Sequence, residues 1–433
     1  MSLKRANEKT GLRRSAAMNR TGGNGKKILL AALLMASTAL WADNLPGSSL
    51  PVRTEYTPHA AEIQCPGGTD PLAVCFSIAC GDGFVKMGDG SDIYTFGFQL
   101  ADPDPTMIWT NGRLGAEFPA PTFYAKEGQH IYWTLTNIGM IMRPDLFDPH
   151  TIHFHGFPNA ASIFDGEPMA SMGITQNNSL TYFYDLQQPG TFMFHCHQEA
   201  SEHMQMGMLG QLYILPAQDD LPDGALLGAF THHTGYKYVY DDGDGSTYYD
   251  VEVPIQMSGF DPVFHAADLG IQPPPFATMV DVYPMLNGRG YPDTVNPAGI
   301  MNNRNTYWAS VPNKIAQKIP ALVTCTKGQK VLLRITSLAT TEFNTLTAPG
   351  LPLMVVGTGA HILRGPDGPG GAPGKNLYYY TQTINLGGGE GNDVIIDTSK
   401  VPAGTYFIYS TNLKNLNNNL QDYGGMMTEF IVQ

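Results

Sequence analysis

Positive charge is scarce in this chain of 433 residues. Its 25 Lys and Arg residues stand against 38 Asp and Glu residues, which gives a net charge of −13 at pH 7. Residues 1–42 hold eight of the basic residues and one acidic residue, so the remaining chain has 17 basic and 37 acidic residues and a net charge of −20. Such a chain repels the phosphate backbone of nucleic acids, and we expect no nucleic acid partner.

The sequence also lacks a hydrophobic run long enough to cross a membrane. Its apolar stretch Ile28–Leu40 has 13 residues, whereas a transmembrane helix needs about 20. This stretch follows Lys26 and Lys27 and precedes Ala42, an order typical of a secretory signal. We therefore expect residues 1–42 to be a signal peptide, and the mature protein to be periplasmic or secreted without a membrane span.

Cysteine is rare, with five residues in the whole chain. In an oxidising compartment Cys65, Cys75, Cys80 and Cys325 could form disulfides in three pairings. The first three lie close together in a segment rich in Gly and Pro. We favour a local disulfide there over a metal site, because no His lies between them. The fifth cysteine, Cys196, stands between two histidines.

Glycine and proline are abundant, with 48 and 32 residues, and together with many Tyr and Phe they favour a turn-rich all-β protein. The chain also repeats itself: Tyr124–Asn137 resembles Cys325–Ser337, and Gly190–His197 aligns with Gly404–Thr411. Each half therefore has the size and pattern of one β-sandwich. We expect a signal peptide at 1–42, an N-terminal extension with the Cys cluster at 43–83, a first domain at 84–217, a linker at 218–250 and a second domain at 251–433.

One set of residues in the first half has the composition of a blue copper site. A trigonal copper site takes two imidazoles and one thiolate, with a long axial methionine. The run from His195 to Met208 reads His-Cys-His, then His203, then Gly-Met, and a second histidine cluster begins at His150. The sequence therefore predicts a copper site formed by His150, Cys196, His203 and Met208.

Strand geometry assigns the remaining clustered histidines to a second site. Successive side chains of a strand point to opposite faces, so His195 and His197 share a face that Cys196 does not. His153 and His155 likewise share a face that His150 does not. Two adjacent strands would thus carry two metal sites back to back, with four histidines in the second, and Cys196 would give a short covalent path between the sites.

The second half has lost this chemistry at every aligned ligand position. The residues aligned with His150, His153 and His155 are Asn344, Thr347 and Pro349. Tyr409, Ser410 and Thr411 replace the His-Cys-His run, and only a methionine survives, at Met426. We expect copper in the first domain and no blue copper in the second.

These residues resemble the cupredoxin domains of multicopper oxidases, from about Phe84 to the C-terminus. The resemblance implies two tandem cupredoxin-like Greek-key β-sandwich domains that assemble as homotrimers. It implies His150, Cys196, His203 and Met208 as type 1 copper ligands, His153 facing a type 2 copper, and His155, His195 and His197 on a type 3 pair. A complete trinuclear cluster in that family uses eight histidines, whereas this chain supplies four, so the nuclearity of the second copper site is left open.

We expect an exported copper oxidoreductase that takes electrons from a small-molecule reductant or a redox protein. One alternative is a periplasmic blue copper electron-transfer or copper-tolerance protein, because Met140, Met142, Met204 and Met206 surround the site and thioethers favour Cu(I). A further alternative is a nitrite-reductase-like enzyme, for which His361 would be the candidate ligand from the second half.

Overall fold

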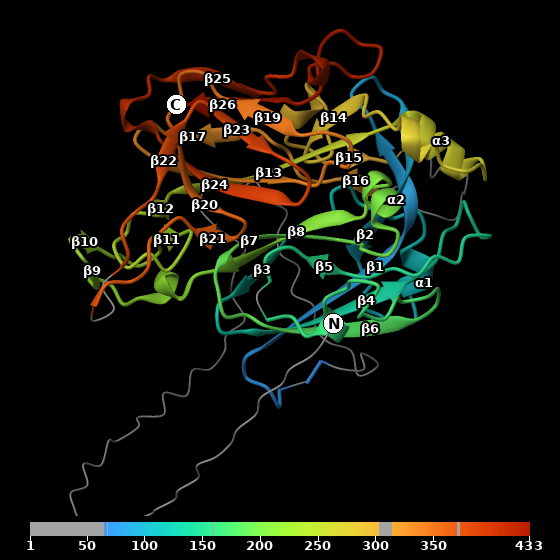
Figure 1. Ribbon diagram of the computed structural model, residues 1–433, viewed down its shortest axis with the longest axis horizontal. Coiled ribbons are helices and arrows are strands. Elements are labelled where there is room, and N and C mark those ends of the chain that lie inside the picture. The colour runs from blue at the N-terminus through green and yellow to red at the C-terminus, as the bar shows by residue number, and fades with distance from the viewer. Residues whose placement is uncertain (1–64, 67, 158, 303–313, 370–372) are drawn as a thin grey trace, which may run out of the picture. The chain divides into compact units, whose positions relative to one another are not determined.

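The computed structural model describes residues 65–433 except 67, 158, 303–313 and 370–372. The chain there is mostly β-strands with a few short helices, as Figure 1 shows. The expected signal peptide lies outside these residues. Within the described part of the chain, no helix combines the length and the apolar character that a membrane crossing requires.

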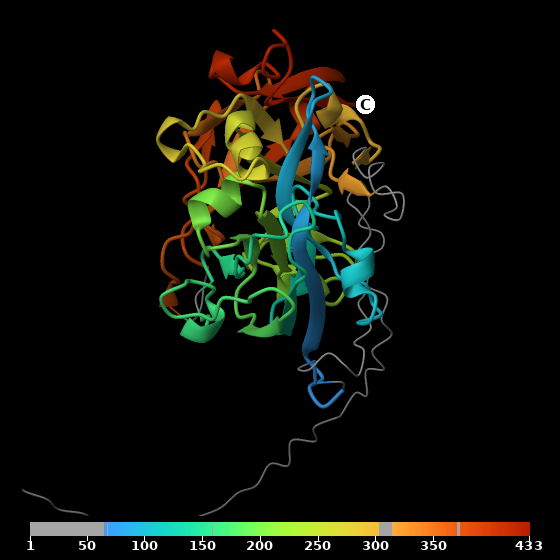
Figure 2. The same ribbon diagram turned by 90° about the vertical axis from the view of Figure 1, so that its right-hand side faces the viewer.

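The first half contains two four-stranded sheets, ordered β2-β1-β4-β6 and β3-β8-β7-β5. Their strands are β1 (Ala73–Lys86), β2 (Asp92–Leu100), β3 (Phe123–Lys126), β4 (His130–Asn137), β5 (His153–Phe154), β6 (Ser179–Asp185), β7 (Gly190–His195) and β8 (Leu209–Leu215). Figure 2 shows the long strand β1, in blue, from the side. Trp133 of β4 and Phe194 of β7 meet edge to face in the core between the sheets, with ring centroids 5.2 Å apart.

The second half repeats this plan with two larger sheets, ordered β14-β13-β18-β24-β20-β21 and β17-β26-β25-β19-β23, with β22 paired to β20. The strands are β13 (Val251–Phe260), β14 (Tyr283–Leu286), β17 (Val323–Cys325), β18 (Lys330–Ser337), β19 (Asn344–Thr347), β20 (Leu353–Thr358), β21 (His361–Ile362), β22 (Tyr379–Thr381), β23 (Thr383–Leu386), β24 (Glu390–Asp397), β25 (Gly404–Tyr409) and β26 (Met427–Val432). Aliphatic side chains of both sheets form one buried core between them.

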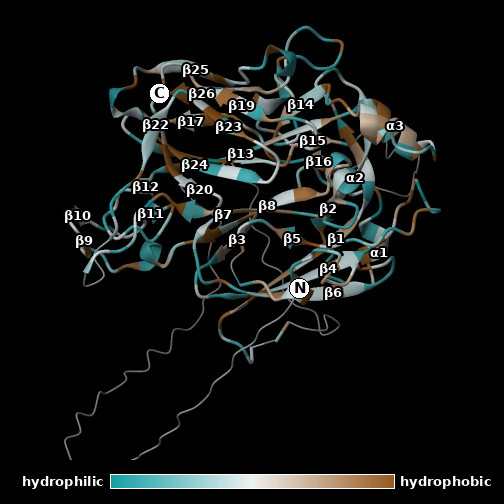
Figure 3. Ribbon diagram, in the orientation of Figure 1, coloured by the Kyte–Doolittle hydropathy of each residue, from teal (hydrophilic) through white to brown (hydrophobic). Residues whose placement is uncertain are grey.

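The repeat seen in the sequence is present in the strand pairing. β1 pairs parallel with β4, as β13 does with β18, and β3 pairs parallel with β8, as β17 does with β26. The register also agrees: His153 lies opposite His195, and Thr347 lies opposite Tyr409. The all-β, cupredoxin-like fold class is therefore confirmed. Figure 3 shows the hydrophobic residues concentrated on strands such as β8 and the hydrophilic ones on many outer loops.

Residues 218–250, which we expected to be a linker, contain several short strands. Four short strands form two hairpins there: β9 (Leu226–Leu227) with β10 (Phe230–Thr231), and β11 (Lys237–Tyr238) with β12 (Tyr248–Tyr249). Tyr238 and Tyr249 are buried. Two-residue strands carry no detectable sequence period, so the hydrophobic pattern alone could not reveal them. The domain boundaries themselves remain a prediction.

The remaining elements are short. The helices are α1 (Ile108–Asn111), α2 (Ala200–Gln205) and α3 (Pro262–Leu269), and β15 (Ile300–Met301) pairs with β16 (Ile315–Gln317). Single 3-10 turns span Ser162–Phe164, Ala217–Asp220, Phe276–Thr278, Asp293–Val295, Thr398–Lys400 and Leu413–Asn415. Cys65 and Cys75 form a disulfide, which is the local pairing we favoured, while Cys80 and Cys325 are free and buried.

The two halves share a buried polar network next to β7. Arg334 of β18 is fully buried, and its guanidinium donates from Nε to Glu252 Oε2 at 2.7 Å and from Nη1 to Thr191 Oγ1 at 2.7 Å. Thr191 of β7 in turn donates to Asp393 Oδ1 of β24 at 2.5 Å. The carboxylates of Glu252 and Asp393 compensate the buried cation, while Arg334 Nη2 has no hydrogen-bond partner among the described residues. The network holds β7, the strand that leads to Cys196, against the second half.

Candidate metal centre

Cys196 lies directly after β7, and its sulfur faces two imidazoles. Cys196 Sγ is 3.7 Å from His150 Nδ1 and 3.2 Å from His203 Nδ1. Their ligand atoms all lie within 4.8 Å of one another, and all three residues are buried. The backbone N–H of Thr151 points at the same sulfur from 3.4 Å. A thiolate here has a hydrogen-bond donor and two imidazole nitrogens around it.

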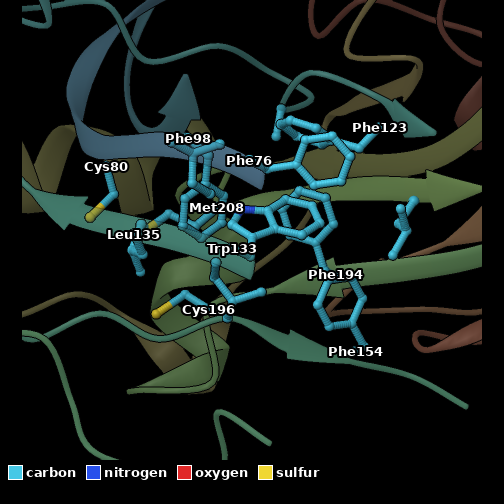
Figure 4. Close-up of a cluster of buried hydrophobic side chains, with 14 of the residues drawn as sticks. Phe76, Cys80, Phe98, Phe123, Trp133, Leu135, Phe154, Phe194, Cys196 and Met208 are labelled. Atoms are coloured by element: carbon cyan, nitrogen blue, oxygen red, sulfur yellow. The ribbon is translucent and has the colours of Figure 1, made fainter. Parts of the chain in front are cut away.

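Met208 belongs to the same buried region. Its side chain is fully buried, and its backbone carbonyl accepts a hydrogen bond from the Cys196 N–H at 3.1 Å. Figure 4 shows Met208 and Cys196 in the cluster around Trp133 and Phe194. All four residues predicted for the first site are therefore brought together in one buried region of the first half.

The charge state of the two imidazoles depends on their surroundings. Burial and the neighbouring His203 lower the pKa of His150, which favours the neutral ring that binds metals. Burial also lowers the pKa of His203, but the Cys196 thiolate and Asp148 outweigh it and raise that pKa to about 10. Asp148 Oδ2 lies 3.5 Å from His203 Nε2. A metal cation in this pocket would replace the extra proton on His203.

A second group of histidines lies on the opposite face of the strand pair β5 and β7. The ligand atoms of His153, His155 and His195 lie within 4.8 Å of one another. The ring of His197 joins them, with its centroid 4.8 Å from that of His153 and 5.4 Å from that of His195. The four predicted residues thus share one face, which is not the face of Cys196.

Three of these rings have a carbonyl partner at Nδ1. His153 Nδ1 lies 2.7 Å from the Asp165 carbonyl oxygen, and His195 Nδ1 lies 2.8 Å from that of Cys196. His155 Nδ1 lies 3.2 Å from the Gly389 carbonyl oxygen, in the second half. A carbonyl oxygen only accepts, so each Nδ1 carries the proton and donates it. In a neutral ring Nε2 is then left with a lone pair.

These lone pairs face one another. His155 Nε2 and His195 Nε2 are 2.9 Å apart. Burial and the neighbouring histidines lower the pKa of His195 to about 3, and burial with His153 lowers the pKa of His155, so neither ring readily takes a second proton. Two unprotonated acceptors at this distance repel each other, and a shared cation removes the repulsion. The donor set therefore fits a metal, and imidazole nitrogens suit copper.

The two groups are connected through the backbone of adjacent residues. His195 and Cys196 are neighbours in sequence, and the His195 Nδ1–H donates to the Cys196 carbonyl. The second link is through Thr151, whose hydroxyl accepts from the His197 N–H at 3.1 Å while its own N–H points at Cys196 Sγ. A short path of covalent and hydrogen bonds thus joins the thiolate to the histidine cluster.

An open pocket of about 550 Å³ borders the cluster at His197. Its lining includes His197, the carboxylates of Glu167, Glu199 and Glu202, and no Lys or Arg. Glu199 and Glu202 lie at the start of α2, the helix that carries His203. The pocket therefore borders the histidine cluster at His197. Its acidic lining favours neutral or cationic molecules over anions, most strongly above about pH 7, the value to which burial raises the pKa of Glu202.

The remaining sequence candidates lie elsewhere. Met140 and Met206 are buried in the first core, with Met142 packed against it, and Met204 packs against the core between the halves. His361 is exposed on β21, with Nδ1 2.9 Å from the Gly359 carbonyl. Across the described residues, it belongs to none of the groups of ligand atoms that could hold a metal.

The second half retains the shape of the first pocket without its chemistry. Asn415 Nδ2 donates to Asn344 Oδ1 at 3.2 Å, and the N–H of Ser410 donates to the Met426 carbonyl at 2.9 Å, as that of Cys196 does to Met208. Met426 N–H donates to the Asn415 carbonyl, as Met208 N–H does to His203. Asn415 is therefore the counterpart of His203. The alignment missed it, because the loop after Ser410 differs in length from the loop after Cys196.

Comparisons with known proteins give a family match for part of the chain and a fold for most of it. Residues 100–219 match the family model described as multicopper oxidase. No curated protein matches the chain. A blue copper oxidase from Nitrosomonas europaea is structurally similar, with a TM-score of 0.58 and 20% identity over 83% of this chain and 85% of that one. The multicopper oxidase mgLAC has a TM-score of 0.56 and 19% identity over 83% and 86% of the two chains.

A copper nitrite reductase from Nitrosomonas europaea is also similar, with a TM-score of 0.50 and 14% identity over 83% of this chain and 94% of that one. At these identities the structural likeness establishes the fold. Residues 100–219 thus match a multicopper oxidase domain model, in a chain with a cupredoxin-type fold. The family match and the fold together support a copper-dependent oxidoreductase.

Proposed function

We propose that this protein is an exported oxidoreductase with two copper sites in its first half. His150, Cys196, His203 and Met208 would hold a type 1 copper, and His153, His155, His195 and His197 a second copper site. Bound copper supplies a one-electron couple, Cu(II)/Cu(I), at each site. The protein itself holds the ligands, excludes water from the buried thiolate pocket and admits the reductant.

The observation that carries the proposal is the opposite orientation of adjacent side chains at the end of β7. Cys196 faces His150 and His203, whereas His195 faces His155, and the Cys196 carbonyl accepts the His195 hydrogen bond at 2.8 Å. A thiolate and an imidazole cluster in such direct connection suit electron transfer from the first site to the second. A protein that only stored copper would need no such connection.

Two observations bear on the alternatives. Of the four methionines behind the copper-tolerance alternative, Met140 and Met206 are buried in the core and offer no thioether at the surface, whereas Met142 and Met204 are partly buried and Met169 of the pocket lining is exposed. Nitrite is an anion, whereas the pocket beside His197 is lined by three carboxylates and no cationic side chain. We propose a neutral or cationic small-molecule reductant, or a redox protein, as the electron donor.

Export and assembly are part of the proposal. The charge of −20 after residue 42 and the Cys65–Cys75 disulfide suit an oxidising compartment outside the cytoplasm, periplasmic or extracellular. We also propose a homotrimer, in which a neighbouring copy would add to the incomplete set of four histidines. Light scattering with the mature protein tests the trimer independently of the copper content.

Copper content and spectra test the proposal directly. We expect at least two coppers per chain, an intense blue absorption and two paramagnetic species. One copper per chain would contradict the second site. Three coppers per chain would indicate a dinuclear second site, and four a complete trinuclear cluster beside the first copper.

Two variants separate the sites. Cys196→Ser removes the thiolate and should abolish the blue absorption and turnover; Cys80→Ala, another free buried cysteine, should keep both. His153→Ala should keep the blue absorption and lose turnover by about two orders of magnitude or more, while His130→Ala, a histidine paired with Asp70, should keep turnover. Full activity in His153→Ala would contradict the two-site mechanism.

A further inference from the structure

We infer that the second half positions His155, through the turn Gly387–Gly389 that precedes β24. This inference rests on the proposed function, because it concerns a residue of the second copper site. It assigns a role in that site to a half of the chain that supplies none of its histidines. Gly389 would be a positioning residue, acting through His155.

The contact is close and specific. The Gly389 carbonyl accepts the hydrogen bond of His155 Nδ1–H at 3.2 Å. A Cβ built on Gly389 would lie 2.6 Å from His155 Cε1 and 2.8 Å from His155 Nδ1, closer than real Cβ contacts. Gly389 also has φ = +87°, which only glycine adopts readily. The turn therefore fits against the imidazole ring because residue 389 has no side chain.

The turn is held from the second half. Gly389 N–H donates to the Ser337 carbonyl of β18 at 2.8 Å. Gly387 N–H donates to the Glu390 carboxylate at 2.7 Å, and Glu390 N–H returns to the Gly387 carbonyl at 3.3 Å. Gly389 is thus fixed relative to β18 and β24, whose Arg334 and Asp393 are themselves joined to β7.

The consequence is a fixed tautomer at His155. His153 and His195 take their Nδ1 partners from the first half, Asp165 and Cys196. His155 takes its partner from the second half. A partner at Nδ1 sets the ring plane and leaves Nε2 free as the ligand atom. Replacing a partner of this kind, next to a metal ligand, weakens metal binding by roughly 10–100-fold. Without Gly389, His155 would turn and its Nε2 would no longer face His195.

The test compares two glycine substitutions with equal backbone strain. Gly389→Ala places a methyl group against His155. Gly328→Ala is the control, because Gly328 has φ = +98° and nothing within 4 Å of its added Cβ. We expect both variants to lose thermal stability to a similar degree and to keep the blue absorption. Gly389→Ala alone should bind copper at the second site about 10-fold or more weakly, measured by copper stoichiometry under a competing chelator and by paramagnetic resonance.

A second variant and a second readout guard against a folding defect. Glu390 is exposed, so Glu390→Ala should fold normally and loosen the turn, with a smaller loss of second-site copper. In 15N-histidine spectra of the copper-free full chain, the signal of His155 is identified by its absence in His155→Gln. In the wild type and in Gly328→Ala this signal should be that of a ring protonated at Nδ1. In Gly389→Ala it should shift toward Nε2–H.

The outcomes distinguish this inference from the proposed function. A wild-type protein with one copper per chain would overturn the proposed function, yet the His155 tautomer in the copper-free chain would still decide the positioning role. Equal second-site affinity and the same His155 signal in Gly389→Ala and Gly328→Ala would overturn the positioning role while leaving the two-site proposal intact.

Discussion

The clustered histidines present two different ring nitrogens to their sites. His150 and His203 face the Cys196 sulfur with Nδ1, whereas His155 and His195 face each other with Nε2. For His155 and His195 the choice follows from the partner of the other nitrogen, because a carbonyl that accepts from Nδ1–H leaves Nε2 with the free lone pair. Histidines close together in the chain thus offer different ring nitrogens to a metal, and the hydrogen bond at the other nitrogen decides which one.

A pH-dependent contribution to stability is expected from Glu117, a buried residue of the first half away from the metal groups. Burial raises the pKa of Glu117 to about 7, although Lys318 Nζ lies 2.6 Å from its carboxylate and Lys314 also lowers it. The folded chain then binds the proton more tightly than the unfolded chain, whose glutamates titrate near 4.3. The contribution of the Glu117 proton to the free energy of unfolding is complete below about pH 4.3 and is lost as the pH rises through about 7.

Glu117→Gln should flatten this dependence. A shift of this size corresponds to roughly 4 kcal/mol between about pH 4.3 and pH 7, at about 1.4 kcal/mol per pKa unit. Urea unfolding at a series of pH values measures it, with Glu429→Gln, an acidic residue of β26, as the control. Parallel stability curves for wild type and Glu117→Gln would show that this carboxyl does not titrate in the expected range.

At the scale of elements, strand alternation was enough to predict how the ligands group. Side chains two residues apart share a face, so the sequence separates Cys196 from His195 and His197 before any coordinates are known. The internal repeat likewise gave the register, since Thr347 and Tyr409 are paired as His153 and His195 are. These features depend only on period and order along the chain, which a sequence carries directly.

Other parts of the site depend on contacts between distant segments. The hydrogen bond from His155 to Gly389 joins residues that are 234 positions apart, and nothing in the local pattern of either residue indicates it. The helix α2, which carries His203, begins after Glu199, a non-glycine residue with φ = 49°. Such a start follows from packing around His203 and not from helix propensity. Asn415 was missed for a related reason, because loop lengths differ between the repeats.

The pocket of β19 and β25 in the second half should accept a restored copper site. Asn344, Ser410, Asn415 and Met426 are buried in the positions of His150, Cys196, His203 and Met208. In a Cys196→Ser background, which lacks the native thiolate, we expect Asn344→His, Ser410→Cys and Asn415→His together to restore a blue absorption with added Cu(II). The larger imidazoles should cost about 1–3 kcal/mol through overpacking.

The matched control omits Ser410→Cys and keeps the two histidines. Without a thiolate it should give no blue band, even if it binds copper. Circular dichroism establishes that both variants remain folded. A folded variant with all three replacements that stays colourless at saturating copper would show that the second pocket no longer has ligand geometry.

At the scale of the whole molecule, the halves have different tasks. The first half holds the candidate ligands, and the second half braces β7 through Thr191, Arg334 and Asp393 and contacts His155 through Gly389. A core of apolar side chains from both halves, including Met193 of β7 and Phe260 of β13, excludes water between them. The second half therefore contacts the site although it has none of the copper ligands.

The charge of the molecule should determine which reductants react fastest. Residues 43–433 carry a net charge of −20, and three of these acidic residues, Glu167, Glu199 and Glu202, line the pocket beside His197. A cationic reductant is attracted over distances comparable with the Debye length, about 10 Å at 0.1 M salt, and an anionic one is repelled. Reduction by hexaammineruthenium(II) should slow several-fold as salt rises from about 10 to 200 mM, reduction by ferrocyanide should accelerate, and reduction by neutral hydroquinone should change little.

Stopped-flow bleaching of the blue absorption measures these rates one turnover at a time. The double variant Glu199→Gln and Glu202→Gln removes two of the carboxylates that line the pocket and should reduce the salt dependence for the cation. It should leave the rate with hydroquinone near the wild-type value, because a neutral molecule gains nothing from those charges. If all three reductants showed the same salt dependence, electrons would enter the protein at a place where these carboxylates have no influence.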